Sequence, residues 1–491
     1  MVLSKRLAPS RRLTRGWAGG SAIVVAALLS STAFAQVQVQ SLAAPDLFST
    51  PAAETGLPAD LWKDASPGIV GDVLPKLATK PLSPAGAGLA RRVLATGANA
   101  PAGIGDNPDL GAARASALIA LGDAAGADVV LDRVPGVANS TALSQAAAEA
   151  ALITGADDKA CRIGEALSVE RGGAYWLRLR AFCQVLAGQH DAAQLTLNLA
   201  LQQAKDPDYA RLMGAVISGT PAGAANLRNG LNYALSRKLG LDIQAAAATA
   251  SPALKPVLKS TGEVAGLAGG ADLTAAQTSD LAFLRQAKGL AAFTDAAKAS
   301  LPSIAALARA DAPLEDPMLF ARAALAAGDL ATAQTIRGKL TGDTIPGATS
   351  TDLALLDAAL AAAGGAKDSQ ILDGLIERGA QAGPKSPTQP AALILAALGG
   401  AMSPEARAQF AGLDPGKSTA SAARLAVLDD AAAAGRKGEA ALLALSVCAD
   451  AGPAGPGPVD RARLVRALLK AGLEADARAL AVEGLLALQV K

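Results

Sequence analysis

Apolar residues recur at helical spacing along most of the chain. One segment places apolar side chains at Ala127, Leu131 and Val134, four and seven residues from its first position, so all three share one face of a helix. Runs of this kind end at glycines, and strand-forming residues are sparse and unclustered. The pattern predicts an all-α chain of amphipathic helices separated by turns.

The glycines that end these helices stand at regular intervals. Gly122, Gly155 and Gly188 are spaced 33 residues apart, and a second series with spacings of 35 to 37 residues starts at Gly328 and continues through Gly364, Gly400, Gly435 and Gly472. A fixed period of this size is typical of a helical repeat array. Six of the glycines are followed five residues later by an alanine: Gly122/Ala127, Gly155/Ala160, Gly188/Ala193, Gly328/Ala333, Gly435/Ala440 and Gly472/Ala477.

Each glycine–alanine pair has a structural rationale. A glycine just after the last helical turn can adopt the left-handed conformation that ends a helix. A small residue in the following helix lets the two helices of a hairpin pack closely. The pairs therefore predict helix-turn-helix units.

The segment from Trp176 to Pro207 resembles the tetratricopeptide repeat (TPR), a helix-turn-helix unit of about 34 residues. Gly188 stands at the turn, and Ala193, Leu197 and Ala200 occupy the small, large and small positions of the second helix. The resemblance implies an all-α, right-handed superhelical array of helix-turn-helix hairpins, a TPR-like α-solenoid that binds partners on a concave face.

The chain divides into six predicted segments. The fifth, residues 219–313, is irregular because its glycines fall out of register, and it is a candidate hinge or partner site. The segments are a secretory signal peptide (1–35), a disordered linker (36–58), an N-terminal helical cap (59–109), a first TPR-like array (110–218), an irregular helical segment (219–313) and a second array with a C-terminal cap (314–491).

The first 35 residues have the three parts of a signal peptide. A short apolar run from Ala22 to Leu29 follows a basic segment, and Ala33-Phe34-Ala35 supplies small residues at the cleavage positions. The run is shorter than the roughly 20 residues of a membrane-spanning helix, which disfavours the alternative of an uncleaved anchor. We expect cleavage after Ala35 and export to a bacterial periplasm. The basic residues are Lys5, Arg6, Arg11, Arg12 and Arg15.

Charge and composition narrow the choice of partner. The chain carries a formal net charge of +2, and removing the five basic residues of the signal peptide leaves −3. A weakly acidic body without a basic cluster disfavours nucleic acid as a partner. Later apolar runs are broken by charge, glycine or proline, so no further transmembrane segment is expected. Aromatic residues make up only 3% of the chain, which predicts a core of Ala, Leu, Val and Ile.

A single histidine, His190, leaves little catalytic chemistry in the chain. It excludes a metal site with two histidines and disfavours a catalytic triad. His190 lies two residues after Gly188, where the TPR-like pattern has an aromatic residue packed inside the hairpin. We therefore expect a packing role for His190, and we predict no catalytic, cofactor-binding or metal-ligating residue.

Two cysteines lie in neighbouring predicted helices. Cys161 is ten residues before a turn near Arg171 and Cys183 is twelve residues after it, so antiparallel helices can bring them face to face. In an oxidising periplasm a disulfide that closes a loop of about twenty residues stabilises a fold by about 3 kcal/mol. The alternative is two separate buried thiols. The third cysteine, Cys448, is expected to be a small buried hydrophobic residue.

One segment, Ala411 to Ser418, matches a relaxed nucleotide-binding pattern: a small residue, four others, then Gly-Lys-Ser. A phosphate-binding loop needs a preceding β-strand and a following helix, so that its backbone amides surround the phosphate. The preceding residues, Pro404 to Phe410, have a helical pattern. We interpret the segment as a turn between helices.

These observations favour a non-enzymatic periplasmic scaffold that binds envelope proteins through stacked hairpins and needs no cofactor. Two alternatives remain open. One is a cell-wall enzyme of the lytic transglycosylase type, some of which carry α-superhelical domains. The other is a structural protein that associates with itself.

Overall fold

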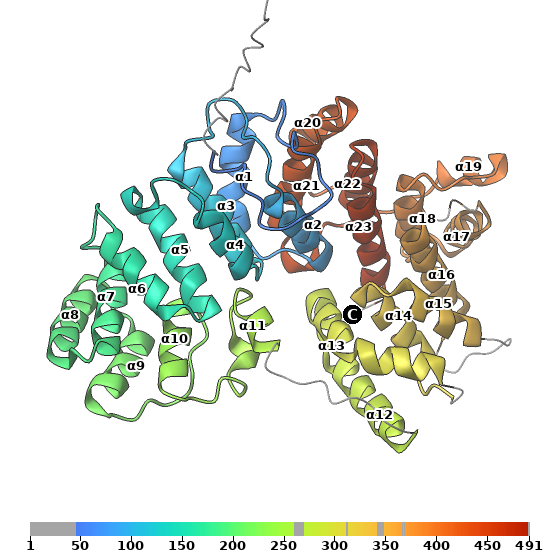
Figure 1. Ribbon diagram of the computed structural model, residues 1–491. Helices are drawn as coiled ribbons and strands as arrows, with labels where there is room; N and C mark the ends of the chain where they lie inside the picture. Colours follow the sequence, from blue (N-terminus) through green and yellow to red (C-terminus); the bar gives the residue numbers. More distant parts are fainter. Residues whose placement is uncertain are drawn as a thin grey trace, which may run out of the picture. The chain divides into compact units, whose positions relative to one another are not determined.

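The structure, a computed structural model, describes residues 46–259, 270–310, 313–340, 348–365, 367 and 369–489. Every regular element in these ranges is a helix (Figure 1), which confirms the predicted all-α class. The predicted signal peptide, its cleavage site after Ala35 and residues 36–45 of the predicted linker lie outside the described residues.

The helix bounds are as follows. The helices of the N-terminal and middle parts are α1 (Pro67–Thr79), α2 (Pro84–Ala95), α3 (Pro108–Ala120), α4 (Ala124–Leu131), α5 (Thr141–Thr154), α6 (Asp157–Ala166), α7 (Ala174–Leu186), α8 (His190–Gln203), α9 (Pro207–Ser218), α10 (Gly230–Lys238), α11 (Lys255–Lys259), α12 (Gly270–Gln286) and α13 (Gly289–Arg309). Those of the C-terminal part are α14 (Pro317–Ala327), α15 (Leu330–Lys339), α16 (Ser350–Gly364), α17 (Ser369–Ala382), α18 (Thr388–Ala397), α19 (Pro404–Phe410), α20 (Ala422–Ala433), α21 (Lys437–Ala451), α22 (Pro458–Lys470) and α23 (Glu474–Ala487). Short 3-10 turns lie at η1 (Val137–Asn139), η2 (Ala247–Thr249) and η3 (Gly452–Ala454).

One helix ending recurs at all six glycines of the glycine–alanine pairs. After each glycine, the N–H of the next residue donates a hydrogen bond to the carbonyl five residues earlier, as from Asp123 to Leu118 (2.9 Å). The glycines have positive φ, a conformation that strains any other residue. This turn of the backbone lets the hydrogen bond satisfy one of the last carbonyls of the helix. They are Gly122 (φ 88°), Gly155 (86°), Gly188 (72°), Gly328 (91°), Gly435 (72°) and Gly472 (77°).

These turns join the helix pairs α3/α4, α5/α6, α7/α8, α14/α15, α20/α21 and α22/α23. The alanine five residues after each turn has no exposed surface, so the two helices approach closely there. The six alanines are Ala127, Ala160, Ala193, Ala333, Ala440 and Ala477. Two other glycines of the series are displaced by one residue, since the positive φ occurs at Gly365 and Gly399 and not at Gly364 and Gly400.

The pairs do not contact one another in simple sequence order. In a linear array each unit touches only its neighbours. Here α22 packs on α18 as well as on α20, and α23 packs on α14, α16 and α18. The predicted C-terminal cap is therefore wrong: α23 has buried residues on all its faces, including Leu480, Val482 and Leu485, and belongs to the core.

The first two helices pack against the last ones (Figure 1). Helix α1 contacts α3 and α21, and α2 contacts α21 and α23. Glu439 of α21 accepts a hydrogen bond from the backbone N–H of Ser66 before α1 (2.6 Å), and Glu483 of α23 accepts one from Ala85 in α2 (2.5 Å). A carboxylate at a helix N-terminus satisfies unpaired N–H groups. The predicted N-terminal cap thus also covers the end of the chain.

Residues 46–50 are packed and residues 51–58 are half-buried or exposed, which corrects the first of these parts of the predicted linker. Phe48 is fully buried. The guanidinium of Arg114 in α3 is also buried and donates to four backbone carbonyls, two in this segment and two near the end of α2, over 2.9–3.1 Å. Burial lowers the pKa of Arg114 to about 10, so the group is still charged at neutral pH. The segment is fastened to the core by this residue.

The middle segment, residues 219–313, contains long helices as well as short ones. Helices α12 and α13 have 17 and 21 residues, and α13 packs on α14. Helix α10 packs on α5. Residues 243–254 lie mostly in turns, and α11 follows them. Both ends of the segment therefore join the packed core.

Candidate binding site

A separate hydrophobic cluster lies among helices α5 to α10, around Trp176, Phe182 and Tyr209. Trp176 and Phe182 belong to α7, the first helix of the pair that resembles a TPR unit. Two hollows lie beside this cluster, and they make it the candidate binding site.

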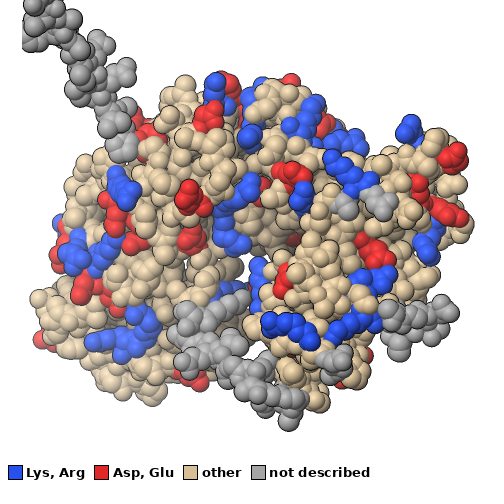
Figure 2. All heavy atoms as spheres, turned by 45° about the vertical axis from the view of Figure 1, so that its right-hand side comes forward, with Lys and Arg blue, Asp and Glu red and all other residues tan. Residues whose placement is uncertain are grey.

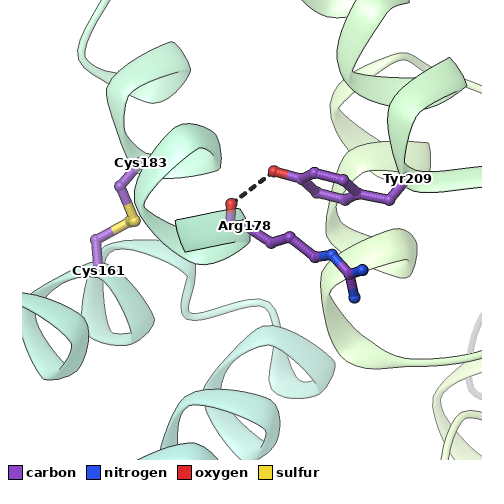
Figure 3. Close-up of a disulfide and its surroundings, with 4 residues drawn as sticks. All are labelled: Cys161, Arg178, Cys183 and Tyr209. Carbon is purple, nitrogen blue, oxygen red and sulfur yellow. Dashed lines mark hydrogen bonds between the residues drawn. A yellow bond between two sulfur atoms is a disulfide. The ribbon is translucent and has the colours of Figure 1, made fainter. Parts of the chain in front are cut away.

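A disulfide joins α6 and α7 next to the cluster (Figure 3). The Sγ atoms of Cys161 and Cys183 are 2.03 Å apart, so the predicted pair lies at disulfide distance. Cys448 is buried in α21, as predicted, and burial raises the pKa of its thiol to about 12. This thiol therefore stays protonated at neutral pH.

Tyr209 fastens α9 to α7. Its hydroxyl donates to the backbone carbonyl of Arg178 (2.6 Å), and the Arg178 guanidinium lies 5.8 Å from the centre of the tyrosine ring (Figure 3). The same guanidinium pairs with Asp206, just before α9 (3.3 Å). Burial raises the pKa of Tyr209 far above neutral pH, so the hydroxyl remains a donor. These contacts join α9 to α7, and the disulfide joins α6 to α7.

The larger hollow, about 480 Å³, lies where the N-terminal ends of α5 and α7 meet the end of α8. Its walls include Gln145, Tyr175, Trp176 and Gln203. The two amides offer donors and acceptors, and the rings offer apolar surface. Among its lining residues the charged one is the acidic Glu170. The hollow therefore suits an uncharged segment better than an anion.

The loop beside the larger hollow is strained at Glu170. This residue has φ 45°, and among the described residues only one other non-glycine residue has a positive φ. Such a conformation costs on the order of 1–3 kcal/mol and is common near functional sites. The carbonyl of Glu170 accepts the N–H of Gly173, the residue before α7 (3.3 Å). The strained residue therefore lies in the turn that leads into α7.

Next to the larger hollow, Glu149 of α5 lies beside the hydroxyl of Tyr175. Its carboxylate accepts a hydrogen bond from the backbone N–H of Gly230, the first residue of α10 (2.8 Å). Burial raises the pKa of Glu149, although the bond from Gly230 partly opposes this, and burial raises the pKa of Tyr175 well above its usual value. The contact between α5 and α10 is thus sensitive to protonation.

The smaller hollow, about 300 Å³, lies between α6 and α7. Its lining includes the disulfide, Trp176, Arg180 and Gln184. Gly164 leaves room there, because a Cβ at this position would lie 3.2 Å from the side chain of Leu179. Trp176 borders both hollows, so its fluorescence can report on either.

Helix α8 presents apolar side chains to solvent. Leu195 is 64% exposed and Leu199, one turn later, is 46% exposed. The helix carries no charged residue from Ala192 to its last residue, Gln203. We call the exposed residues Ala192, Leu195, Asn198, Leu199 and Gln202 the α8 face. An apolar patch with a polar rim is typical of an interaction surface.

His190 is exposed, which corrects its predicted packing role. It is the first residue of α8, and Ala193 and Leu197 supply the buried side of that helix. The side chain therefore projects from the open end of the helix.

The nucleotide-like segment is a turn between α19 and α20. Asp460 of α22 accepts hydrogen bonds from the backbone N–H groups of Thr419 (2.8 Å) and Ala420 (3.0 Å), and from the hydroxyl of Ser418. Burial acts to raise the pKa of Asp460, but these bonds outweigh it and the pKa is lowered. The end of the segment is thus held to α22, and a helix rather than a strand precedes it, as predicted.

No group of three or more His, Cys, Asp and Glu side chains is placed to hold a metal ion within the part of the chain that the structure describes. In the same residues, no helix is both long and apolar enough to cross a membrane.

No protein-family model, curated protein or solved structure matches the chain significantly. The TPR resemblance thus rests on the residue pattern alone. Sequence reasoning did not identify Gln145, Tyr175 or Gln203. The adjacent rings of Tyr175 and Trp176, in a chain with three residues of each type, were the one available signal.

Proposed function

We propose that the chain is a TPR-like helical-repeat scaffold of the periplasm that binds a segment of another envelope protein without catalysing a reaction. The larger hollow carries this proposal, because it combines aromatic rings with two amide side chains on α5, α7 and α8. Extended polypeptide needs both kinds of contact, since it presents side chains and unpaired backbone groups together.

The proposed mode of binding follows from the lining residues. An apolar side chain of the partner packs against Tyr175 and Trp176, while its backbone N–H and C=O groups pair with Gln145 and Gln203. Figure 2 shows acidic and basic side chains interspersed on the face that it draws. The net charge of −3 in the proposed mature chain and the acidic Glu170 favour a partner segment that is neutral or basic. The right-handed superhelical arrangement is proposed for the three pairs α3/α4, α5/α6 and α7/α8, which contact one another in chain order.

Site-specific photo-crosslinking in intact cells tests the proposal. A photoreactive residue replaces Gln145 in the larger hollow, and the matched control replaces Gln409, an exposed glutamine of α19. We expect a discrete crosslinked envelope protein from position 145 and none from position 409. Equal products at both positions, or none at 145, would contradict the proposal. Turnover of peptidoglycan by the purified protein would instead support the cell-wall enzyme.

A further inference from the structure

The α8 face ends in opposite charges. Asp191 lies at the N-terminal end of α8, four residues before Leu195, and Lys205 lies six residues after Leu199. Both are exposed, and the nearby ion pairs, Arg178 with Asp206 and Arg211 with Asp208, leave them free. Between them the helix surface is uncharged. A solvated helix rarely lacks charge over three turns, whereas an interface centre does.

The two charges lie at opposite ends of the α8 face. At a rise of 1.5 Å per residue, Asp191 lies about 6 Å before Leu195 along the helix, whereas Lys205 follows the end of the helix at Gln203 and the extended residue Ala204. An antiparallel copy of α8 centred between the leucines sets Leu195 opposite Leu199. It also brings Asp191 of each copy to the end of the face at which Lys205 of the other copy lies.

From this arrangement we propose that the α8 face binds the same face of a second copy of this chain, antiparallel, about a two-fold axis. A self-complementary patch is what a two-fold interface requires, because each contact occurs twice. The Asp191–Lys205 contact thus forms at both ends. Antiparallel packing also places the positive end of each helix dipole beside the negative end of the other.

The size of the surface sets the expected affinity. Helix α8 has 14 residues, about 21 Å, so one helix–helix contact is smaller than the roughly 800 Å² per partner of a standard interface. We expect a dimer that dissociates in the micromolar range. This inference is independent of the proposed function, since the larger hollow and the α8 face are tested by different positions.

Sedimentation velocity across a range of protein concentrations tests the pairing. The wild-type protein is expected to shift from monomer to dimer, and Leu199→Glu is expected to raise the dissociation constant at least tenfold. Val427→Glu is the matched control, because Val427 on α20 is similarly exposed (42%). Circular dichroism establishes that each variant is folded.

A charge exchange distinguishes this pairing from any other use of the face. Asp191→Lys and Lys205→Asp alone should each weaken the dimer about fivefold or more, because each converts two attractive contacts into repulsive ones. The double variant should return to within about twofold of wild type. A monomer at every concentration, a dimer unaffected by Leu199→Glu, or a double variant as weak as the single ones would overturn the proposal. In those cases a crosslink from position 145 would still support the proposed function.

Discussion

Removing the charge of Glu483 is expected to destabilise the fold strongly. Glu483 and Arg461 are only 5% and 2% exposed, and Oε1 of the glutamate lies 2.6 Å from Nη1 of the arginine. The other carboxylate oxygen accepts the N–H of Ala85 in α2 (2.5 Å). Glu483→Gln keeps the shape of the side chain and an acceptor for Ala85. It therefore removes mainly the charge opposite Arg461.

The magnitude follows from burial. Two unit charges about 4 Å apart attract by about 4 kcal/mol at an effective dielectric constant of 20. Breaking a buried ion pair costs about 3–5 kcal/mol, because the remaining charge stays buried without its partner. Arg461 cannot relax easily, since it also donates to the carbonyls of Pro456 and Leu480 (both 3.2 Å). We expect Glu483→Gln to lower the free energy of unfolding by about 3 kcal/mol.

Urea unfolding followed by circular dichroism measures this loss. The matched control is Asp429→Asn, which breaks the exposed pair between Asp429 of α20 and Arg463 of α22, the helix that also carries Arg461. This change should cost less than about 1 kcal/mol. Adding Arg461→Met to Glu483→Gln should cost at least about 2 kcal/mol less than the two single losses together. If Glu483→Gln were no more harmful than the control, the buried pair would not hold α22 to α23 as argued.

Three further predictions concern single contacts. Gly438→Ala should lower the free energy of unfolding by about 2 kcal/mol in thermal unfolding, because the new Cβ would lie 2.4 Å from the carbonyl oxygen of Leu61. An unchanged stability would mean that α21 and the Leu61 backbone lie farther apart. Replacing Cys161 and Cys183 by serine should lower the free energy of unfolding by about 3 kcal/mol, because the disulfide closes a loop of 22 residues. Adding reductant to the wild type should lower it by the same amount. An unchanged midpoint of urea unfolding would contradict the disulfide. Glu149→Gln should remove a pH dependence of the free energy of unfolding. Because the pKa of Glu149 is raised in the folded state, its stabilising contribution is present below pH 4.5 and is lost as the pH rises through the folded-state pKa. Urea unfolding at a series of pH values should therefore show this loss in the wild type and not in the variant.

Local features of the fold were predictable because they depend on residues close in sequence. The turn at Gly155 needs a left-handed residue after a helix, and Ala160 follows at a fixed distance on the buried side of the next helix. Cys161 and Cys183 lie in helices joined by a short connection, so their contact also followed from spacing.

Contacts between distant parts of the chain were not predictable in this way. Nothing near Phe48 in sequence indicates the buried Arg114 that fastens its segment to α3. The burial of α23 depends on α14, α16 and α18, which are far from it in sequence. The lining of the larger hollow has the same origin, because Gln145 and Gln203 come from different helix pairs.

The position of α23 leads to a prediction that separates this packing from a linear array. In a linear array, losing the last pair exposes one face of the preceding unit, and the rest unfolds cooperatively. Here a chain ending at Gly457 loses α22 and α23, and with them the partners of Arg92 and Ala85 in α2, namely Asp476 (2.7 Å from Arg92) and Glu483. The apolar surfaces of α14, α16 and α18 are uncovered at the same time.

We therefore expect the truncated chain to lose its sharp thermal transition and to bind a hydrophobic dye. Its circular dichroism should show a larger loss of helix than the removal of two helices accounts for. The control chain ends at Leu488 instead, which leaves α22 and α23 in place. A truncated chain with proportionate helix content and a single sharp transition would show that α23 is dispensable. The retained units would then behave as a linear array, and the coupling between the two ends of the chain would have no part in its stability.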